Sequence, residues 1–513
     1  MNGAESLIAT AVAAGVNVCF ANPGTTEMPL VAALDSVAGM RAVLALFEGV
    51  CTGAADGYAR MSGKPALTLL HLGPGLANGL ANLHNARRAN SPVVNVIGDQ
   101  ATWHLAADAP LTSDIVSLAS PMSFWVRSVK SALALAADTA AAIAASLTPP
   151  GGVSTLIVPS DCQWDRAATA ASPRPVPARA HVAGATIDRV AKLVGSGAPC
   201  TILLGGHALS RHGLDTAARI AAVSGCRLMT ETFAACIERG VGIPAPARLP
   251  YFPEQALEAL AGNKLLILAG TKSPVAFFAY PGLPSSLVPE GCVAEVLAKV
   301  EEDALAALDA LAEALNAARS VPASALKTPS LPTGALTPAT LGAALAALQP
   351  ENAIVVDESA TSGGPYGALA ASAKPHTCLA LTGGAIGQGL PSATGAAVAC
   401  PGRRVIALQA DGSSMYTFQA LWTQAREGLN VTTLLCSNRA YRILQIEAAR
   451  AGNTEPGRNA RSLTELTPPE IGFAQLARGL GVPGVRVETA DDLVRELDRA
   501  LRTAGPNLIE AML

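Results

Sequence analysis

The segments "IALQADGSSMYTFQAL" (residues 406–421) and "LLCSNRAY" (residues 434–441) decide how this sequence is predicted to fold. Each begins with a short apolar run and then reaches a polar residue, Asp411 in the first segment and Asn438 in the second. Short apolar runs that end at turns are typical of buried strands in parallel sheets. We therefore expect a strand–helix–strand unit that brings Asp411 and Asn438 to neighbouring strand ends.

The same alternation of apolar strands and helical segments extends through all 513 residues. Strands are predicted in the runs "VNVCFANPG", "PALTLLHLGPG", "APCTILLGG", "KLLILAG" and "NAIVVDES". This pattern predicts an α/β protein with three doubly wound parallel-sheet domains. Two proline-rich stretches, residues 171–181 and 320–338, are expected to be linkers. They divide the chain into domains at 1–170, 182–320 and 335–513.

The composition argues against several classes of protein. The net charge is −3 without a basic cluster, which argues against binding to nucleic acid or to an anionic membrane surface. The apolar runs are interrupted by Gly, Pro and charged residues, so we expect no membrane-spanning helix. The N-terminal residues lack a basic segment and predict an amphipathic helix, not a signal peptide. The ten cysteines are scattered singly, which predicts reduced thiols in a cytoplasmic protein.

The residues around Asp411 favour a metal-bound diphosphate. Carboxylate and amide oxygens such as those of Asp411 and Asn438 are hard ligands that suit magnesium. Gly412 and Ser413 then open a helix, whose N-terminal N–H groups favour a phosphate. An ordinary turn with an asparagine cap is the alternative interpretation.

The spacing of these residues resembles the diphosphate motif of thiamine diphosphate (ThDP) enzymes, in which GDG is followed by NN one strand–helix–strand unit later. Ala410 and Ser437 replace the first residue of each half of the motif, but the side chains expected to hold the metal are retained. The family's third protein ligand is a backbone carbonyl. The resemblance implies magnesium ligands at Asp411, Asn438 and Ala440, and cofactor contacts at Gly412, Ser413 and Tyr441.

A second motif, "LALFEGVCTGAADGYARMSGKP" (residues 44–65), resembles the family's glutamate followed by A-x-G-Y-A-R-x-S/T-G-x-P. The resemblance implies that Glu48 bonds the aminopyrimidine ring of ThDP. There it promotes the imino tautomer that removes the C2 proton to form the ylid. A helix N-terminal glutamate stabilised by the helix dipole is the alternative.

A third motif, "LTGGAIGQGLPSATGAA" (residues 381–397), resembles the family segment that passes beneath the cofactor. The resemblance implies that Ile386 props the two rings into a V shape and that the Gly384 carbonyl faces the exocyclic amine. Taken alone, this glycine pattern is similar to a dinucleotide fingerprint. It lacks the acidic residue expected about 20 positions later.

Within this family, the chain looks most like 2-keto acid decarboxylases and acetohydroxyacid synthases. "FANPGTTEMPL" (residues 20–30) resembles a stretch of benzoylformate decarboxylase that carries an active-site serine, and Thr25 occupies that position. His71 falls on a catalytic histidine of the same enzyme. The Gly-Pro-Gly at residues 73–75 resembles acetohydroxyacid synthases instead. Further cofactor contacts are implied at Pro23, Gly24 and Thr361.

The resemblance also implies a substrate pocket. His104 lies in a loop expected to border it, although a surface loop is the alternative. Benzoylformate decarboxylase has a second catalytic histidine where this chain has "TKSPVAFFAYPG" (residues 271–282), which contains Phe277 and no histidine. This departure puts the family's proton relay in doubt.

The segment after Asn438 corresponds to a family helix that lines the pocket, with Ile443 and Leu444 at pocket positions. Glu447 falls where the benzoylformate enzyme has an aromatic residue, and a carboxylate beside a phenyl ring is costly unless it is paired. A polar or aliphatic substrate is therefore favoured over an aromatic one. Glu447 is expected either to pair with Arg442 or Arg450 or to lie on a solvated face.

The resemblance implies a ThDP- and Mg²⁺-dependent C–C lyase or ligase that decarboxylates a 2-keto acid through an ylid and an enamine. The alternatives are an acetolactate synthase-like carboligase, a 2-hydroxyacyl-CoA lyase, and a non-catalytic relative that binds a nucleotide or a partner. FAD is not expected, because residues 236–254 lack room for a flavin-contacting insertion. The family places ThDP between two subunits, which implies a homodimer at least, and we expect a homotetramer.

Overall fold

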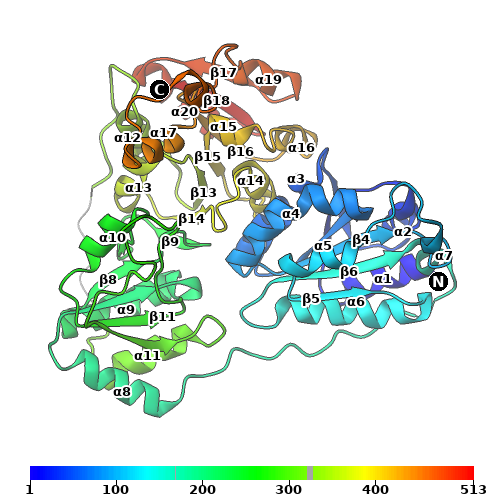
Figure 1. Ribbon diagram of the computed structural model, residues 1–513, viewed down its shortest axis with the longest axis horizontal. Helices are drawn as coiled ribbons and strands as arrows, with labels where there is room; N and C mark the ends of the chain where they lie inside the picture. The colour runs from blue at the N-terminus through cyan, green and yellow to red at the C-terminus, as the bar shows by residue number, and fades with distance from the viewer. Residues whose placement is uncertain (168, 321–326) are drawn as a thin grey trace. The chain divides into compact units, whose positions relative to one another are not determined.

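The computed structural model describes residues 1–167, 169–320 and 327–513 (Figure 1). The chain divides into a first compact unit, Met1–Val176, Pro329–Leu369 and Leu381–Leu513, and a second unit, Pro177–Thr328 and Ala370–Ala380. The linker predicted at residues 320–338 lies partly outside the described residues. The finer division into three domains by residue number stays a prediction.

The first unit contains an N-terminal sheet of six parallel strands in the order β2-β1-β3-β4-β6-β5. In β1, Cys19 and Ala21 pack into the core beneath α1 and α2, whereas the ring of Phe20 points the other way and meets Tyr58 of α3. Both faces of the sheet are therefore buried, which explains its continuous apolar runs. The elements are α1 (Gly3–Ala13), β1 (Val18–Asn22), η1 (Thr25–Glu27), α2 (Met28–Ser36), β2 (Arg41–Leu44), α3 (Glu48–Ser62), β3 (Ala66–His71), α4 (Leu72–Ala89), β4 (Val93–Asp99), η2 (Leu105–Ala107), α5 (Ile115–Ala119), η3 (Ser120–Met122), β5 (Trp125–Ser128), α6 (Ala132–Leu147), β6 (Val153–Pro159) and α7 (Ser160–Trp164).

The first unit also contains a C-terminal set of parallel strands in the order β17-β18-β16-β15-β13. Ala410 at the end of β15 lies opposite Cys436 of β16, so Asp411 and Asn438 follow neighbouring strand ends. The elements are α12 (Pro338–Leu348), β13 (Ala353–Glu358), α13 (Gly364–Leu369), α14 (Gly389–Ala399), β15 (Val405–Ala410), α15 (Asp411–Ser414), α16 (Ala420–Arg426), β16 (Val431–Ser437), α17 (Arg442–Arg450), α18 (Arg458–Ser462), α19 (Phe473–Gly479), β17 (Gly484–Val487), α20 (Ala490–Arg502) and β18 (Asn507–Met512).

Helices α3 and α14 pack closely within the first unit, and glycines make this possible. A Cβ atom on Gly57 would lie 2.1 Å from the carbonyl oxygen of Ser392, and one on Gly395 would lie 1.8 Å from that of Ala54. No side chain fits at either distance, so the two backbones approach only because these positions are glycine. The contact joins the helix that begins at Glu48 to α14, the helix formed by the second half of the third sequence motif.

The second unit contains five parallel strands in the order β10-β8-β7-β11-β12. In β7, Ile202 and Leu204 pack with the helices α8, α9 and α11, whereas Leu203 packs with Leu260 of α10 on the opposite face. This unit also contains a short antiparallel pair, β9 with β14, which is not part of the five-stranded sheet. The elements are α8 (Gly184–Val194), β7 (Cys200–Leu204), η4 (Gly206–Leu209), α9 (Arg211–Ser224), β8 (Arg227–Thr230), β9 (Ile237–Arg239), β10 (Ala247–Arg248), α10 (Pro253–Leu260), β11 (Leu265–Ala269), β12 (Val293–Ala298), α11 (Ala304–Ala314), η5 (Ala370–Ser372) and β14 (His376–Ala380).

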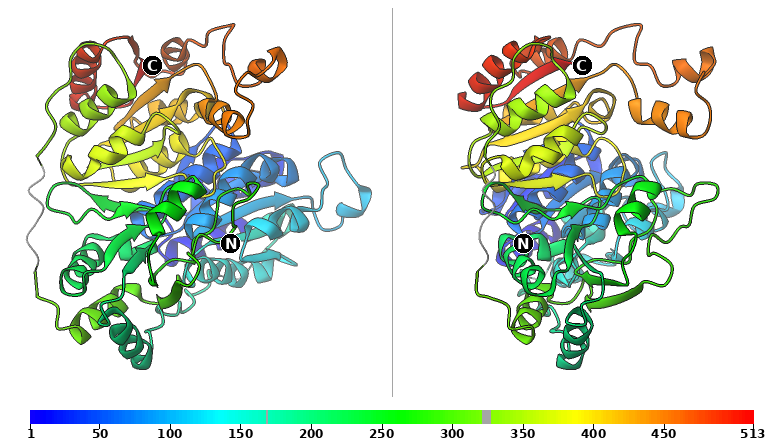
Figure 2. Two further views of the ribbon diagram at one scale, coloured as in Figure 1. Left: turned by 60° about the vertical axis from the view of Figure 1, so that its left-hand side comes forward. Right: turned by 90° about the vertical axis from the view of Figure 1, so that its left-hand side faces the viewer.

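Helices flank the sheets of each unit, as Figures 1 and 2 show. The predicted fold class, α/β with doubly wound parallel sheets, is therefore confirmed. Within the described part of the chain, no helix is both long and apolar enough to cross a membrane.

Candidate active site

Glu48 is the first residue of α3 and is 9% exposed. Asn78 of α4 donates a hydrogen bond from Nδ2 to its Oε2 (3.0 Å). Among the described residues nothing donates to Oε1, so one carboxylate oxygen is held by the protein and the other is available. This is the arrangement expected of a carboxylate that binds a polar ring through one oxygen.

His71 ends β3, and its ring is oriented by the fully buried Glu27. The Nδ1 atom lies 2.7 Å from Oε2 of Glu27 and 3.3 Å from the hydroxyl of Thr26. Because a carboxylate only accepts hydrogen bonds, Nδ1 carries the proton and Nε2 is left to accept or release one. The next residue, Leu72, has a left-handed backbone (φ 54°), a strained conformation that recurs at functional sites.

The position of Glu27 depends on its neighbours at the strand ends. Its carboxylate also accepts hydrogen bonds from the backbone N–H of Gly24 (2.8 Å) and from the hydroxyl of Thr26 (2.6 Å). A Cβ atom on Gly98 would lie 1.7 Å from Oε1 of Glu27, so the carboxylate occupies space that only glycine leaves. Burial raises the pKa of the neighbouring Asp99, and the charge of Glu27 adds to this effect.

The residues predicted around the NPG turn are only partly brought together. Thr25 is exposed, whereas Thr26 contacts both His71 and Glu27. Pro23 is half-buried beside Gly24, whose absent Cβ leaves room for the His71 ring. Sequence reasoning missed Thr26 and Glu27. An acidic residue three positions after the glycine of the NPG turn was the signal that could have pointed to Glu27.

Gly384 and Ile386 lie in the loop that precedes α14. Gly384 is exposed and left-handed (φ 77°), a conformation that favours glycine. Its carbonyl accepts no hydrogen bond from any residue that the structure describes, and Ile386 is half-buried. The free carbonyl of Gly384 can accept a hydrogen bond from an amine. The large apolar side chain of Ile386 can support a ring beside it.

Asp411 is a buried carboxylate without a cationic partner among the described residues. Its two oxygens accept hydrogen bonds from the backbone N–H groups of Gly412 (2.7 Å) and Arg439 (2.6 Å). Burial raises the pKa of Asp411, although these N–H groups lower it in part. Such an uncompensated anion suits a nearby cation.

The backbone after β16 turns sharply to reach Asp411. Arg439 is left-handed (φ 57°), which lets its N–H point at that carboxylate. The side-chain Oδ1 of Asn438 accepts a hydrogen bond from the N–H of Ala440 (3.0 Å). Asp411, Asn438 and the Ala440 carbonyl would together supply a set of hard oxygen donors that fits magnesium. Among the described residues, no cluster of three or more His, Cys, Asp or Glu side chains is placed to hold a metal.

The other residues predicted to contact the diphosphate, Tyr441, Ser413 and Thr361, have different surroundings. The ring of Tyr441 covers Gly412, where a Cβ atom would lie 2.5 Å from the ring. The hydroxyl of Ser413 is already bonded, since it accepts from Nε2 of Gln409 (2.7 Å). Thr361 lies half-buried in the turn after β13, and no described residue bonds its hydroxyl.

The predicted pocket residues divide between the two units. Ile443 is half-buried and Leu444 is 49% exposed on α17, a helix without fully buried residues. Glu447 forms an ion pair with Arg450 (3.5 Å), one of the two partners expected for it. His104 stacks edge-on against the exposed Trp103.

Phe277 belongs to the second unit, where it joins a cluster of aromatic rings. Its ring centroid lies 5.6 Å from that of Phe233 and 5.2 Å from that of Tyr251. Phe277 and Phe278 are 41% and 54% exposed. The cluster is therefore a partly solvated apolar surface of this unit.

The two ends of the chain match models of known protein families. Residues 1–118 match the N-terminal TPP-binding domain of thiamine pyrophosphate enzymes, and residues 364–511 match the C-terminal TPP-binding domain. These ranges contain Glu48 and His71 in the first case and Asp411 and Asn438 in the second.

Related proteins match over the full length. A Mycobacterium tuberculosis protein, which carries the provisional name acetolactate synthase large subunit IlvX, is 52% identical over 100% of this chain and 99% of its own. Benzoylformate decarboxylase of Pseudomonas aeruginosa is 29% identical over 97% of this chain and 96% of its own. The fold is shared with the ThDP-dependent 4-hydroxybenzoylformate decarboxylase of Rhodococcus jostii, at a TM-score of 0.86 and 24% identity over 100% of this chain and 99% of that one.

Proposed function

Since this chain belongs to the thiamine pyrophosphate enzyme family, of decarboxylase and acetolactate synthase type, we propose that it decarboxylates a 2-keto acid with ThDP and Mg²⁺. The observation that carries this proposal is the orientation of His71, whose Nδ1 is fixed by Glu27 so that Nε2 can exchange a proton with substrate. ThDP, when bound, supplies the electron sink for cleavage of the carbon–carbon bond.

The residues of the first unit fit this cofactor in separate roles. Glu48 would hold the aminopyrimidine ring through its unbonded Oε1, and the Gly384 carbonyl would accept a hydrogen bond from the ring's amine. Ile386 would support the two rings. Asp411, with Asn438 and the carbonyl of Ala440, would hold magnesium on the diphosphate, and Tyr441 would cover that site.

We further propose that the active form is a homodimer or homotetramer in the cytoplasm. The exposed Leu444 and the absence of fully buried residues along α17 support a pocket wall that is completed by another subunit. The cysteines Cys19, Cys51, Cys162 and Cys436 are buried free thiols, which supports a reducing compartment.

An acetolactate synthase-like carboligase is the second candidate, because the 52% identical relative carries that name. The two candidates share the decarboxylation and differ in the step after it. In a decarboxylase a proton completes the product, and His71 is suited to supply it. In a carboligase a second carbonyl compound takes the place of the proton.

The test is product analysis with a panel of 2-keto acids of aliphatic, polar and aromatic type. Apo-protein is incubated with ThDP and Mg²⁺, and the products are identified by mass spectrometry. A released aldehyde would support the decarboxylase, and a longer hydroxyketo acid would support the carboligase. Glu48→Ala is the matched inactive control, and its full turnover would contradict the role given to Glu48.

A further inference from the structure

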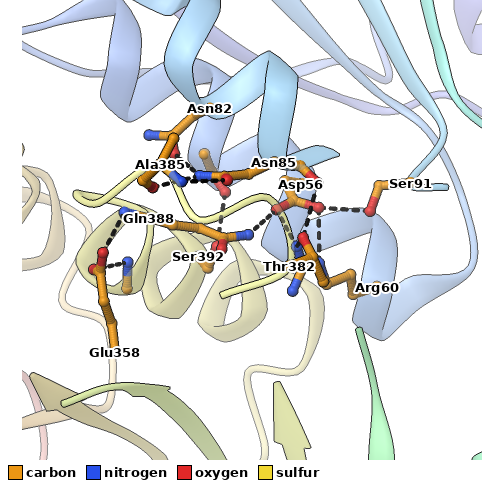
Figure 3. Close-up of polar contacts among 12 residues, drawn as sticks. Asp56, Arg60, Asn82, Asn85, Ser91, Glu358, Thr382, Ala385, Gln388 and Ser392 are labelled. Carbon is orange, nitrogen blue, oxygen red and sulfur yellow. Dashed lines mark hydrogen bonds and ion pairs between the residues drawn. The ribbon is translucent and has the colours of Figure 1, made fainter. Parts of the chain in front are cut away.

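The loop of residues 382–389, called here the cofactor loop, carries both Gly384 and Ile386. It belongs to neither a helix nor a strand until α14 begins at Gly389. Polar side chains from α3, α4 and β13 nevertheless hold it from several sides (Figure 3). None of these side chains has a role in the proposed function. Their arrangement is explained by the conformation of the loop that they hold.

Two buried asparagines of α4 hold the middle of the cofactor loop. Asn85 donates from Nδ2 to the carbonyl of Ala385 (2.7 Å) and accepts at Oδ1 from the N–H of the same residue (3.2 Å). Asn82 donates to the carbonyl of Gly387 (3.2 Å) and also to that of Gly49 (2.8 Å). Asn85 additionally donates to Oδ1 of Asn82 (3.0 Å), which fixes the orientation of both amides (Figure 3).

The bonds follow alternate residues of the loop. His84 binds the carbonyl of Gly383 through Nε2 (3.1 Å), so the carbonyls of residues 383, 385 and 387 are all held by α4. The carbonyl of Gly384 has no such partner in the described chain. The protein therefore satisfies every second carbonyl and leaves open the one that the cofactor's amine is proposed to use.

A third amide, Gln388, fastens the end of the loop to α3. Its Nε2 donates to Oδ2 of Asp56, a fully buried carboxylate (Figure 3). Asp56 is itself fixed by an ion pair with Arg60 (2.7 Å) and by a hydrogen bond from the hydroxyl of Ser91 (2.5 Å). The Oε1 atom of Gln388 is buried without a hydrogen-bond partner in the described residues. The bond from Nε2 to Asp56 is therefore the contact that this buried amide contributes.

Glu358 at the end of β13 holds the same loop end through the backbone. Its carboxylate accepts from the N–H groups of Gly387 (2.6 Å), Gln388 (3.3 Å) and Gly389 (2.6 Å). These donors open α14, where a helix N-terminus stabilises an anion. Burial raises the pKa of Glu358, and the three N–H groups with the amide of Gln409 lower it in part.

We propose that Asn82, Asn85 and Gln388 form an amide clamp that positions the cofactor loop for ThDP. The clamp residues touch no reacting atom, so they are positioning residues that act through Gly384 and Ile386. The inference rests on the proposed function, because it assigns a purpose to the loop only if ThDP binds there. It goes beyond that function by naming the side chains on which the geometry of the loop depends.

The first test measures the loop in the apo-protein. Asn85→Ala and Gln388→Met each remove one part of the clamp, and Met retains the length of Gln. The matched controls are Asn95→Ala and Gln424→Met, since both residues are fully buried and bond outside the cofactor loop. Hydrogen–deuterium exchange in residues 382–389 should accelerate in the two clamp variants and stay at the wild-type rate in the two controls.

The second test measures ThDP affinity by titration in the presence of Mg²⁺. The clamp variants should bind ThDP about tenfold or more weakly, because each loses a buried hydrogen-bond partner. The controls should bind as the wild type does, although their thermal stability falls by a similar amount. Either unchanged loop exchange or unchanged ThDP affinity in both clamp variants would overturn the clamp.

The outcomes for the clamp and for the proposed function are distinguishable. If the wild type binds ThDP but converts no keto acid, the proposed reaction fails, while weaker binding by the clamp variants still supports the clamp. If the wild type binds no ThDP at all, both are overturned. If the clamp variants lose affinity no more than the controls do, only the clamp is overturned.

Discussion

Two glutamates lie at the carboxyl edges of parallel sheets, Glu27 in the first unit and Glu231 in the second. Glu27 bonds His71 (2.7 Å), the N–H of Gly24 (2.8 Å) and a threonine hydroxyl (2.6 Å). Glu231 directly follows β8, and in the described part of the chain its carboxylate accepts only longer bonds, from the N–H of Gly206 (3.4 Å) and the hydroxyl of Thr271 (3.2 Å). The same residue type at the same place in two similar sheets therefore has different surroundings.

The difference shows what makes a buried carboxylate useful. Burial raises the pKa of Glu231 to about 7, and its two hydrogen bonds offset only part of this effect. No imidazole bonds Glu231 among the residues that the structure describes, so its charge at neutral pH costs stability. The carboxylate of Glu27 instead orients His71, a group that can exchange protons. Ligand sites form at the carboxyl edges of parallel sheets. The side chains around a carboxylate at such an edge determine whether it orients a functional group.

The largest effect is expected from Glu27→Gln. The amide retains the size of Glu27 but loses the charge that fixes the protonated Nδ1 of His71. We expect kcat to fall about a hundredfold with ThDP affinity unchanged, as for loss of an oriented acid–base group. Steady-state kinetics across pH and a ThDP titration measure the two quantities. Asp99→Asn is the control, since Asp99 does not bond His71, and an equal loss of kcat in both variants would contradict the orienting role.

Adding one methyl group to each sheet edge tests the comparison directly. In Gly98→Ala the Cβ atom would lie 1.7 Å from Oε1 of Glu27, so we expect kcat to fall. In Gly205→Ala it would lie 2.6 Å from Thr271 and 2.9 Å from Glu231, and we expect a loss of about 1–3 kcal/mol in stability with kcat unchanged. Kinetics and denaturant unfolding of both variants separate the effects. A loss of kcat in Gly205→Ala alone would reverse the comparison.

Glu231→Gln should stabilise the protein at high pH. Because the folded pKa of about 7 lies above the ordinary value of 4.5, the stability that depends on protonated Glu231 is complete below pH 4.5 and is lost as pH rises through 7. This loss amounts to at most about 3 kcal/mol. Glutamine cannot ionise, so the variant should gain on the wild type between pH 5 and pH 8. Denaturant unfolding at both values checks this, and a pH-independent difference would contradict it.

The smallest effect is expected from Thr271→Val. Valine has the shape of threonine but cannot donate a hydrogen bond to the Glu231 carboxylate. We expect a loss of about 1 kcal/mol at pH 8, where the carboxylate is charged, and a smaller loss at pH 5. Unfolding curves at the two pH values measure it. Thr68→Val, which removes a hydroxyl bonded to the uncharged Asn95, is the control and should show no dependence on pH.

The fold was predicted largely from local patterns. The apolar runs ending at Asn22, Leu204 and Ala410 all form buried parallel strands. These runs are readable because both faces of each sheet are covered, so nearly every strand residue has to be apolar. The antiparallel pair of β9 and β14 was not predicted, since two short strands separated by more than a hundred residues leave no local pattern.

The sequence by itself determined the family, through Glu48, Asp411 and Ile386 at fixed places in recognisable motifs, because a cofactor demands particular side chains at each of its ends. Only the tertiary structure decided which other residues hold the predicted site residues and the cofactor loop in position. It paired Glu27 with His71, 44 positions away, and brought Asn85 to the cofactor loop across 300 positions. Hydrogen bonds of this kind form wherever the folded backbone brings two groups within reach, and the linear order of residues does not record that distance.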